Sequence, residues 1–160
     1  MEKKSAPPDA IDRAILQLLQ EDAFMTSKEI AARLNLTTTP VFERVKRLER
    51  EGYIARYAAL LDRRKIGLGM LVFCDVLLKE HYRDFLLQFE AAVVGLPEVL
   101  ECHHITGEYD YLLKVAVRDM DDYQRFIKEK LAALENIGRV QSHFVMTEVK
   151  NSTVLPVEAG

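Results

Sequence analysis

The sequence of 160 residues has few of the features that mark secreted, membrane-spanning or disulfide-stapled proteins. Its two cysteines, Cys74 and Cys102, cannot form a secreted disulfide framework and are expected to be reduced and mostly buried. No apolar run approaches the roughly 20 residues that cross a bilayer, since the longest, over residues 68–78, is broken at Cys74-Asp75. Two lysines near the N-terminus are not followed by the apolar segment of a secretory signal. These absences predict a cytoplasmic protein that does not contact a membrane.

Motifs of catalysis and metal binding are also missing. The chain has no Gly-x-Ser-x-Gly elbow, no glycine-rich phosphate loop and no carboxylate pair spaced for glycoside hydrolysis, so no catalytic residue is predicted. Cys102-His103-His104 has metal-binding residue types, but successive side chains of a strand point to opposite faces and cannot converge on one ion. We therefore predict no metal, no cofactor and no enzymatic activity.

The composition is that of a globular protein, with 49% hydrophobic and 29% charged residues, and the length allows one ordinary domain or two small ones. The net charge of −3 is unevenly divided. Residues 1–66 hold 13 Lys and Arg against 10 Asp and Glu, whereas residues 67–160 hold 9 against 15. This asymmetry predicts two units, of which the basic one faces a polyanion. Chance scatter is the alternative, and the clustering of basic residues at 44–50 argues against it.

Capping signals divide the first half into three helices. Asp9 precedes an apolar stripe of helical period and is a plausible N-cap. Thr26 and Glu29 have the spacing of a capping box, and the helix that they begin ends at Asn35. A third helix starts about three residues later and ends at Gly52. A short helix, a tight turn and a longer helix are typical of a helix-turn-helix.

The third helix has the character of a DNA-recognition helix. Val41, Val45 and Leu48 form a narrow stripe that should pack inward, which leaves hydroxyl and basic side chains on the opposite side. Hydroxyls at the helix start can approach bases or phosphates, and the cations can neutralise phosphate charge. An ordinary amphipathic helix with a solvated face is the alternative. The predicted DNA-binding residues are Thr37, Thr38, Thr39, Glu43, Arg44, Lys46, Arg47 and Arg50.

Segments of β character follow this helix. Residues 53–62 alternate and are rich in strand-forming residues, which predicts a short hairpin or wing and closes a first domain at 9–62. Arg63-Arg64-Lys65 belongs to a basic linker, residues 63–67. The second domain, residues 68–150, has the element order β-α-β-β-α-β of a ferredoxin-like plait. Its predicted elements are strands at 68–78, 99–106, 109–117 and 140–150 and helices at 81–95 and 119–134, the second capped by Asp119 or Asp121.

A ferredoxin-like sheet has helices on one face only, so we expect its other face to form a dimer interface or a ligand platform. The hairpin Thr106-Gly107-Glu108-Tyr109-Asp110-Tyr111 is the chemically densest stretch. Two carboxylates and two phenols at a glycine turn can receive an ammonium group, although a plain polar hairpin tip is the alternative. The ends, residues 1–8 and 151–160, are expected to be mobile.

Three ordered segments resemble the Lrp/AsnC family of prokaryotic transcription factors. They are TTTPVFERVKRLEREGYI, LECHHITGEYDYLLKV and FVMTEVK, and the resemblance covers about residues 9–150. It implies an α+β protein with an N-terminal winged helix-turn-helix and a C-terminal ferredoxin-like effector domain. It also implies a homodimer, commonly assembled into an octamer of four dimers, that binds double-stranded DNA and senses a free amino acid.

The resemblance also implies where the effector binds: between dimers, around the hairpin, the start of the following helix and the last strand. Asp110 or Glu108 would meet the α-ammonium group, amides near Gly107 would hold the carboxylate, and Met120 would line the side-chain pocket. Glu108 stands where many members have aspartate, and His103-His104 replaces a more apolar pair, which leaves the effector open. The implied residues are His104, Thr106, Gly107, Glu108, Tyr109, Asp110, Met120, Asp122, Tyr123 and His143.

Two other functions stay open at this point. Siroheme decarboxylases combine similar domains, and in such an enzyme His103, His104 or His143 would face a tetrapyrrole. A ligand sensor that acts through protein partners without binding DNA is the second alternative.

Overall fold

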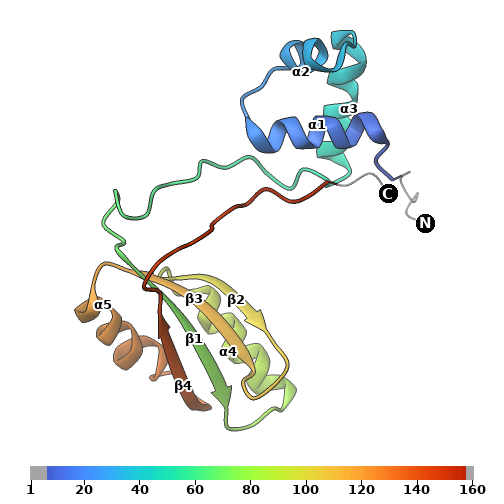
Figure 1. Cartoon of the computed structure of the whole chain (residues 1–160). Helices are drawn as coiled ribbons and strands as arrows, with labels where there is room; N and C mark the ends of the chain where they lie inside the picture. Colours follow the sequence, from blue (N-terminus) through green and yellow to red (C-terminus); the bar gives the residue numbers. More distant parts are fainter. Residues whose placement is uncertain (1–6, 158–160) are drawn as a thin grey trace. The chain divides into compact units, whose positions relative to one another are not determined.

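The structure, a computed structural model, describes residues 7–157 and has the predicted α+β composition (Figure 1). Within that range the chain forms two units. One holds the residues up to Leu60 together with those from Lys150 onward, and the other holds Leu61–Val149. The tail after residue 150, which we expected to be mobile, therefore belongs to the first unit as far as residue 157. Between residues 7 and 157, no helix is long and apolar enough to cross a membrane.

Three helices form the first unit: α1 (Ala10–Glu21), α2 (Ser27–Leu34) and α3 (Thr38–Arg50). Both predicted caps are confirmed. The Asp9 side chain accepts a hydrogen bond from the Asp12 amide at 2.8 Å, and the Asp12 side chain accepts one from the Asp9 amide at 3.0 Å. Thr26 and Glu29 form the reciprocal capping box of α2. These local bonds satisfy amides that have no partner within a helix, so they fix where each helix begins.

A compact apolar cluster joins the three helices. Ile15 of α1, Ile30 of α2 and Val41 and Leu48 of α3 are essentially inaccessible to solvent, as the helical stripe predicted. Asn35 ends α2 in the left-handed conformation, with φ 54°, which turns the chain sharply toward α3. The tight turn places α3 across the other two helices in the arrangement of a helix-turn-helix.

The predicted hairpin at residues 53–62 does not form, because no strand is assigned there. The segment is extended, and Tyr57 donates a hydrogen bond to Glu49 of α3 at 3.1 Å. Residues 53–61 contain no Gly, Pro, Asn or Asp, so nothing in this stretch favours the reversal that a hairpin requires. Alternation without a turn residue was therefore an insufficient signal for the wing.

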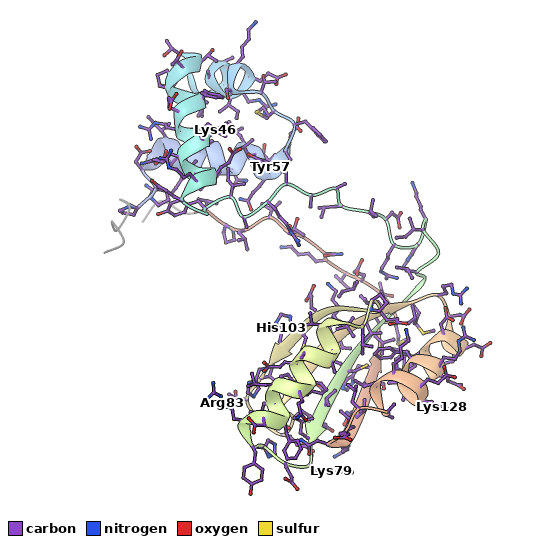
Figure 2. All side chains as sticks on the ribbon, turned by 180° about the vertical axis from the view of Figure 1, so that it is seen from behind. Lys46, Tyr57, Lys79, Arg83, His103 and Lys128 are labelled. Carbon is purple, nitrogen blue, oxygen red and sulfur yellow. The ribbon has the colours of Figure 1, made fainter. Side chains whose placement is uncertain are left out.

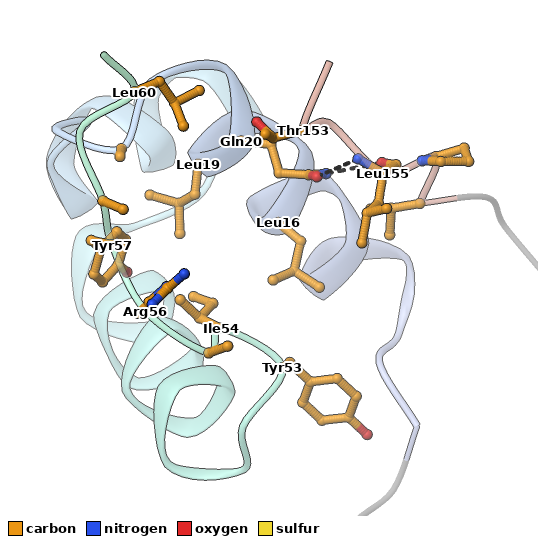
Figure 3. A pocket seen from close by; sticks show the side chains of 15 residues that line it. Leu16, Leu19, Gln20, Tyr53, Ile54, Arg56, Tyr57, Leu60, Thr153 and Leu155 are labelled. Atoms are coloured by element: carbon orange, nitrogen blue, oxygen red, sulfur yellow. Dashed lines mark hydrogen bonds between the residues drawn. The ribbon is translucent and has the colours of Figure 1, made fainter. Parts of the chain in front are cut away.

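The C-terminal strap, which we define as residues 153–157, packs against α1 and the extended segment (Figure 3). Gln20 donates a hydrogen bond from Nε2 to the Leu155 carbonyl at 3.0 Å and accepts one from the Leu155 amide at 2.7 Å. Leu16, Leu19 and Ile54 line the same apolar pocket of about 580 Å³. One side chain thus satisfies both backbone groups of Leu155, as a neighbouring strand would.

The second unit has the predicted β-α-β-β-α-β order. Its antiparallel sheet has the strand order β2-β3-β1-β4, so the two outer strands are β2 and β4. Both helices cover the same face of the sheet, as expected (Figure 1). The elements are β1 (Met70–Leu78), α4 (Arg83–Val94), β2 (Val99–His104), β3 (Tyr111–Val117), α5 (Met120–Arg125), the π-helix η1 (Phe126–Leu131) and β4 (Ile137–Phe144).

Two predicted elements of this unit are different in the structure. The helix expected at 119–134 is an α-helix capped by Asp119 that continues as a π-helix and ends by Ala132. The last strand, expected at 140–150, begins at Ile137 and ends at Phe144. Gly138 favours the early start, because a Cβ there would lie only 3.1 Å from the Leu77 carbonyl oxygen, and glycine allows this close pairing without a shift of the neighbouring backbone.

The buried core lies between the sheet and the helices. Val72, Cys74 and Val76 of β1 alternate toward α4 and α5, while Phe73 and Leu77 point to the face without helices. The same alternation on β2 places His103 and His104 on opposite faces, since His104 stacks on Tyr111 of the core at 4.7 Å and His103 contacts Glu101. Among residues 7–157 no group of three or more potential ligands is arranged to hold a metal ion.

Candidate functional site

The solvent-facing side of α3 carries hydroxyl, acidic and basic groups. Thr37 is the N-cap, but its side chain makes no capping hydrogen bond, and Lys46 projects from the middle of the helix (Figure 2). Lys46 is held by Glu49 at 2.8 Å and lies 5.8 Å from the ring centroid of Phe42. The helix N-terminus and its hydroxyls favour anions. The exposed members of the predicted set are Thr37, Thr38, Thr39, Glu43, Lys46 and Arg50.

Arg44 and Arg47 have a different environment from the rest of the predicted set. Arg44 donates to Asp9 at 2.6 Å and to Asp12 at 2.7 Å, and Arg47 donates to the other oxygen of Asp12. Asp12 is only 1% exposed. We expected Arg47 on the free basic side of α3, but it flanks the apolar stripe, where its long side chain reaches α1. Its guanidinium therefore holds two helices of this unit together.

Electrostatic effects on this network follow from the contacts. The pKa of Asp9 is lowered to about 2, first by the Asp12 amide that it accepts from and then by Arg44. The hydrogen bonds that Arg44 and Arg47 donate to the Asp12 carboxylate raise the pKa of both arginines. The charged form of each group is thus favoured in the folded unit.

The hairpin between β2 and β3 holds most of the implied effector residues, and Gly107 supplies its turn with φ 126°. Asp110 does not have a free carboxylate. Its Oδ2 accepts the Leu78 amide at 2.7 Å, and both oxygens lie about 3 Å from His81 Nε2, at 2.9 and 3.0 Å. Asp110 thereby anchors the hairpin to the end of β1, and binding an ammonium group would compete with these contacts.

Glu108, by contrast, is 73% exposed in its side chain and faces Arg139 of β4 at 3.3 Å. Tyr109 donates to Gln141 of β4 at 2.5 Å, and the Arg139 guanidinium carbon lies 5.6 Å from the Tyr109 ring centroid. The hairpin and β4 together present a carboxylate, a guanidinium and a phenol to solvent. Such a set can bind both charges of a zwitterion. Thr106 is exposed beside them.

The start of α5 lies at the opposite end of β3 from the hairpin, because Tyr111 begins that strand and Val117 ends it. Seven residues of strand span roughly 20 Å. There Met120 is 42% exposed, and Asp122 is bound by Arg118 and Arg125. Tyr123 is also at this end, but its side chain is buried against Ser142 and Cys74. Burial raises the pKa of the Tyr123 hydroxyl and of the Cys74 thiol.

The implied effector residues therefore fall into separate groups within one chain. His143 binds Asp75 at 2.8 Å on the sheet face without helices, while His104 lies on the other face. The hairpin residues form one group, and Met120, Asp122 and Tyr123 form another at the far end of β3. Three residues that complete the hairpin group were not predicted from the sequence: His81, Arg139 and Gln141. For Arg139, alternation along β4 would have been a signal had the strand been placed to start before residue 140, whereas Gln141 lay inside the predicted strand.

Comparison with known proteins agrees with both units. Residues 71–155 match the family model described as the Lrp/AsnC ligand binding domain, and residues 8–55 match a winged helix-turn-helix DNA-binding domain. The chain is 41% identical over 150 residues to the DNA-binding transcriptional activator DecR of Escherichia coli K12, covering 94% of this chain and 99% of DecR. It is equally identical to the leucine-responsive regulatory protein of Salmonella typhimurium, covering 94% of this chain and 92% of that protein.

Solved structures give the same result. A transcriptional regulator of Neisseria meningitidis in complex with L-Met superposes with a TM-score of 0.89 at 38% identity, covering 93% of this chain and 96% of that one. An AsnC family regulator from Agrobacterium tumefaciens has the same TM-score and identity, covering 93% and 97%. These relatives are regulators rather than enzymes, which removes the support for a siroheme decarboxylase. The chain belongs to the Lrp/AsnC family of DNA-binding transcriptional regulators.

Proposed function

We propose that this regulator binds double-stranded DNA as a homodimer and changes its assembly or DNA affinity when a free amino acid binds. The observation that carries the DNA-binding part is the exposed side of α3, with three threonines at its start and Lys46 and Arg50 farther along. Small hydroxyls can approach base edges while the cations neutralise phosphates. As a regulator that reads DNA directly, it acts in the cytoplasm.

A homodimer is supported by the sheet face that lacks helices. Phe73, Leu77 and Leu112 lie on that face and are only partly buried in a single chain. Covering such a face with a second copy buries apolar surface that would otherwise stay in water. Two copies of α3 would then read two half-sites of a pseudo-palindromic operator, and four dimers in an octamer would add avidity along the DNA.

For the effector we propose that Glu108 meets the α-ammonium group and Arg139 the carboxylate. This pair is exposed, so separating it to admit a zwitterion costs little, whereas Asp110 would have to give up its contacts with the Leu78 amide and His81. The L-Met complex of the Neisseria relative supports an amino acid as the ligand class. Met120 and Asp122 can join the hairpin of a different chain, since they lie far from it in their own. No cofactor is required for this response.

Fluorescence anisotropy with a duplex from the protein's own upstream region tests the function. We expect binding that weakens steeply with salt and that shifts when a pool of the twenty amino acids is added. Loss of one charge-assisted contact in Glu108→Gln should raise the effector concentration for half-response by about 10- to 100-fold and leave DNA affinity without effector unchanged. Exposed Glu135→Gln is the matched control.

The outcomes separate the alternatives. DNA binding that ignores the pool contradicts the amino-acid response but keeps the operator function. Failure to bind this duplex and several other upstream duplexes, together with a measurable amino-acid response in assembly by analytical ultracentrifugation, would favour the sensor that acts without DNA.

A further inference from the structure

Asp12 is a buried carboxylate at the junction of α1 and α3. Its side chain is 1% exposed, and it is the one charged residue that is buried in residues 7–157. Each oxygen has identified donors: Oδ1 accepts from Arg44 at 2.7 Å, and Oδ2 accepts from Arg47 and from the Asp9 amide at 3.0 Å. Burying a carboxylate removes its hydration, and this desolvation penalty is offset only where hydrogen-bond donors and cations surround the carboxylate.

The positive charges of Arg44 and Arg47 are paired with carboxylates inside the first unit. Arg44 bridges Asp9 and Asp12, so two guanidinium groups face two carboxylates. The Nε atom of Arg47 is buried and without a hydrogen-bond partner among the described residues, although the side chain as a whole is 30% exposed. Lys46 and Arg50 of the same helix differ, since both are exposed.

The network also fixes the orientation of α3. Arg44 and Arg47 stand three residues apart, nearly one helical turn, and reach the same carboxylate on α1. Two bonds from successive turns to one point oppose both rotation of α3 about its axis and sliding along it. A rotation would change which of Thr39, Lys46 and Arg50 point away from the unit.

We propose that Asp12 is a positioning residue that determines DNA specificity, because it withholds Arg44 and Arg47 from phosphate and fixes the face that α3 presents. Cations that bind phosphate add affinity for any sequence, and each such contact steepens the dependence of log K on log [salt] by about 0.9. Holding two arginines on Asp12 therefore lowers non-specific affinity and preserves the preference for the operator. The inference rests on DNA binding by α3.

The first test is Asp12→Asn, which keeps the shape and one acceptor oxygen but removes the charge. Anisotropy salt series are measured with a random-sequence duplex and with the upstream duplex, after circular dichroism has confirmed the fold. We expect tighter binding to random duplex, a salt slope steeper by about 1 to 2, and a smaller ratio of upstream to random affinity. Glu21→Gln is the matched control, because it makes the same charge change at an exposed position of α1 and should move the slope little.

A second comparison does not depend on Asp12→Asn folding. Arg47→Gln and Lys46→Gln remove neighbouring cations of α3, and the proposal gives them opposite results on random duplex. Lys46→Gln should lower the slope by about 0.9, whereas Arg47→Gln should leave it unchanged while reducing the preference for the upstream duplex.

Three results would overturn the inference. An unchanged slope and preference in folded Asp12→Asn would reduce Asp12 to a purely stabilising role. A slope lowered by about 0.9 in Arg47→Gln would mean that Arg47 contacts phosphate in the wild-type protein. Wild-type protein that binds no duplex at low salt would contradict the proposed DNA-binding function as well.

Discussion

The two units are stabilised in different ways. Among the described residues, the apolar cluster of the helical unit has seven buried members, and that of the sheet unit has thirteen. A small unit buries a smaller fraction of its surface, so polar contacts matter more to its stability. The helical unit accordingly has two capping boxes, the Asp12 network and the Gln20–Leu155 pair. Its charged residues are thus divided between folding and binding.

The sheet unit keeps its charges at the margins of a larger core. Glu108 and Arg139 are exposed at the hairpin end, and Asp75 and His143 lie on the sheet face without helices. These groups are free to exchange an internal partner for a ligand or a second chain at little cost in stability. In the helical unit the same exchange at Asp12 would loosen the unit itself. Effector-binding substitutions should therefore be better tolerated than substitutions in the α1–α3 contact.

Truncating one buried leucine in each unit should have the largest effect on stability and tests this comparison most directly. Leu48 of α3 and Leu113 of β3 are both inaccessible to solvent, so Leu48→Ala and Leu113→Ala each should cost about 2–5 kcal/mol. In scanning calorimetry, Leu48→Ala should lower the midpoint of one transition and Leu113→Ala that of another. The decrease of the midpoint should be greater for Leu48→Ala, because the smaller apolar cluster contributes less to the free energy of unfolding of its unit. A single transition that both variants lower equally would mean that the units unfold together.

Local signals were readable in the sequence. The caps at Asp9 and Thr26 depend on bonds between residues three apart, and the order of strands and helices in the sheet unit depends on short-range periodicity. The glycine at position 107 predicted the hairpin turn, and its φ of 126° confirms it. Each of these features is decided within a few residues, so no knowledge of tertiary structure was needed.

Long-range contacts were not readable. The position of Asp12 in the first turn of a helix is typical of an exposed acid. Only the arginines some 30 residues later explain why it is buried. Asp110 carries the chemistry of an ammonium site, but His81 and the Leu78 amide already occupy it. The strap is the extreme case, since Gln20 and Leu155 are 135 residues apart. The sequence showed which groups were present but not which were already paired.

The strap allows a smaller test of how far the helical unit depends on polar contacts. Gln20→Ala removes both hydrogen bonds to Leu155, and each is worth about 0.5–1.5 kcal/mol. We expect the midpoint of the transition that Leu48→Ala lowers to fall by a few degrees and the other to stay unchanged. Gln17→Ala is the matched control, because Gln17 makes only one long contact on the same helix, to Glu21 at 3.4 Å. Equal shifts in the two variants would mean that the strap does not stabilise the unit.

Asp9 gives the smallest effect and tests the electrostatic part of the comparison. Its pKa is lowered from the ordinary 3.8 to about 2, so its contribution to stability is complete above about pH 4 and is lost as the pH falls through 2. Carboxyl NMR titration should place the Asp9 pKa near 2 in the wild-type protein. In Arg44→Gln it should rise only part of the way to 3.8, because the Asp12 amide is the larger cause. A full return to 3.8 would make the ion pair, rather than the helix cap, the main reason that this end of α1 is stable.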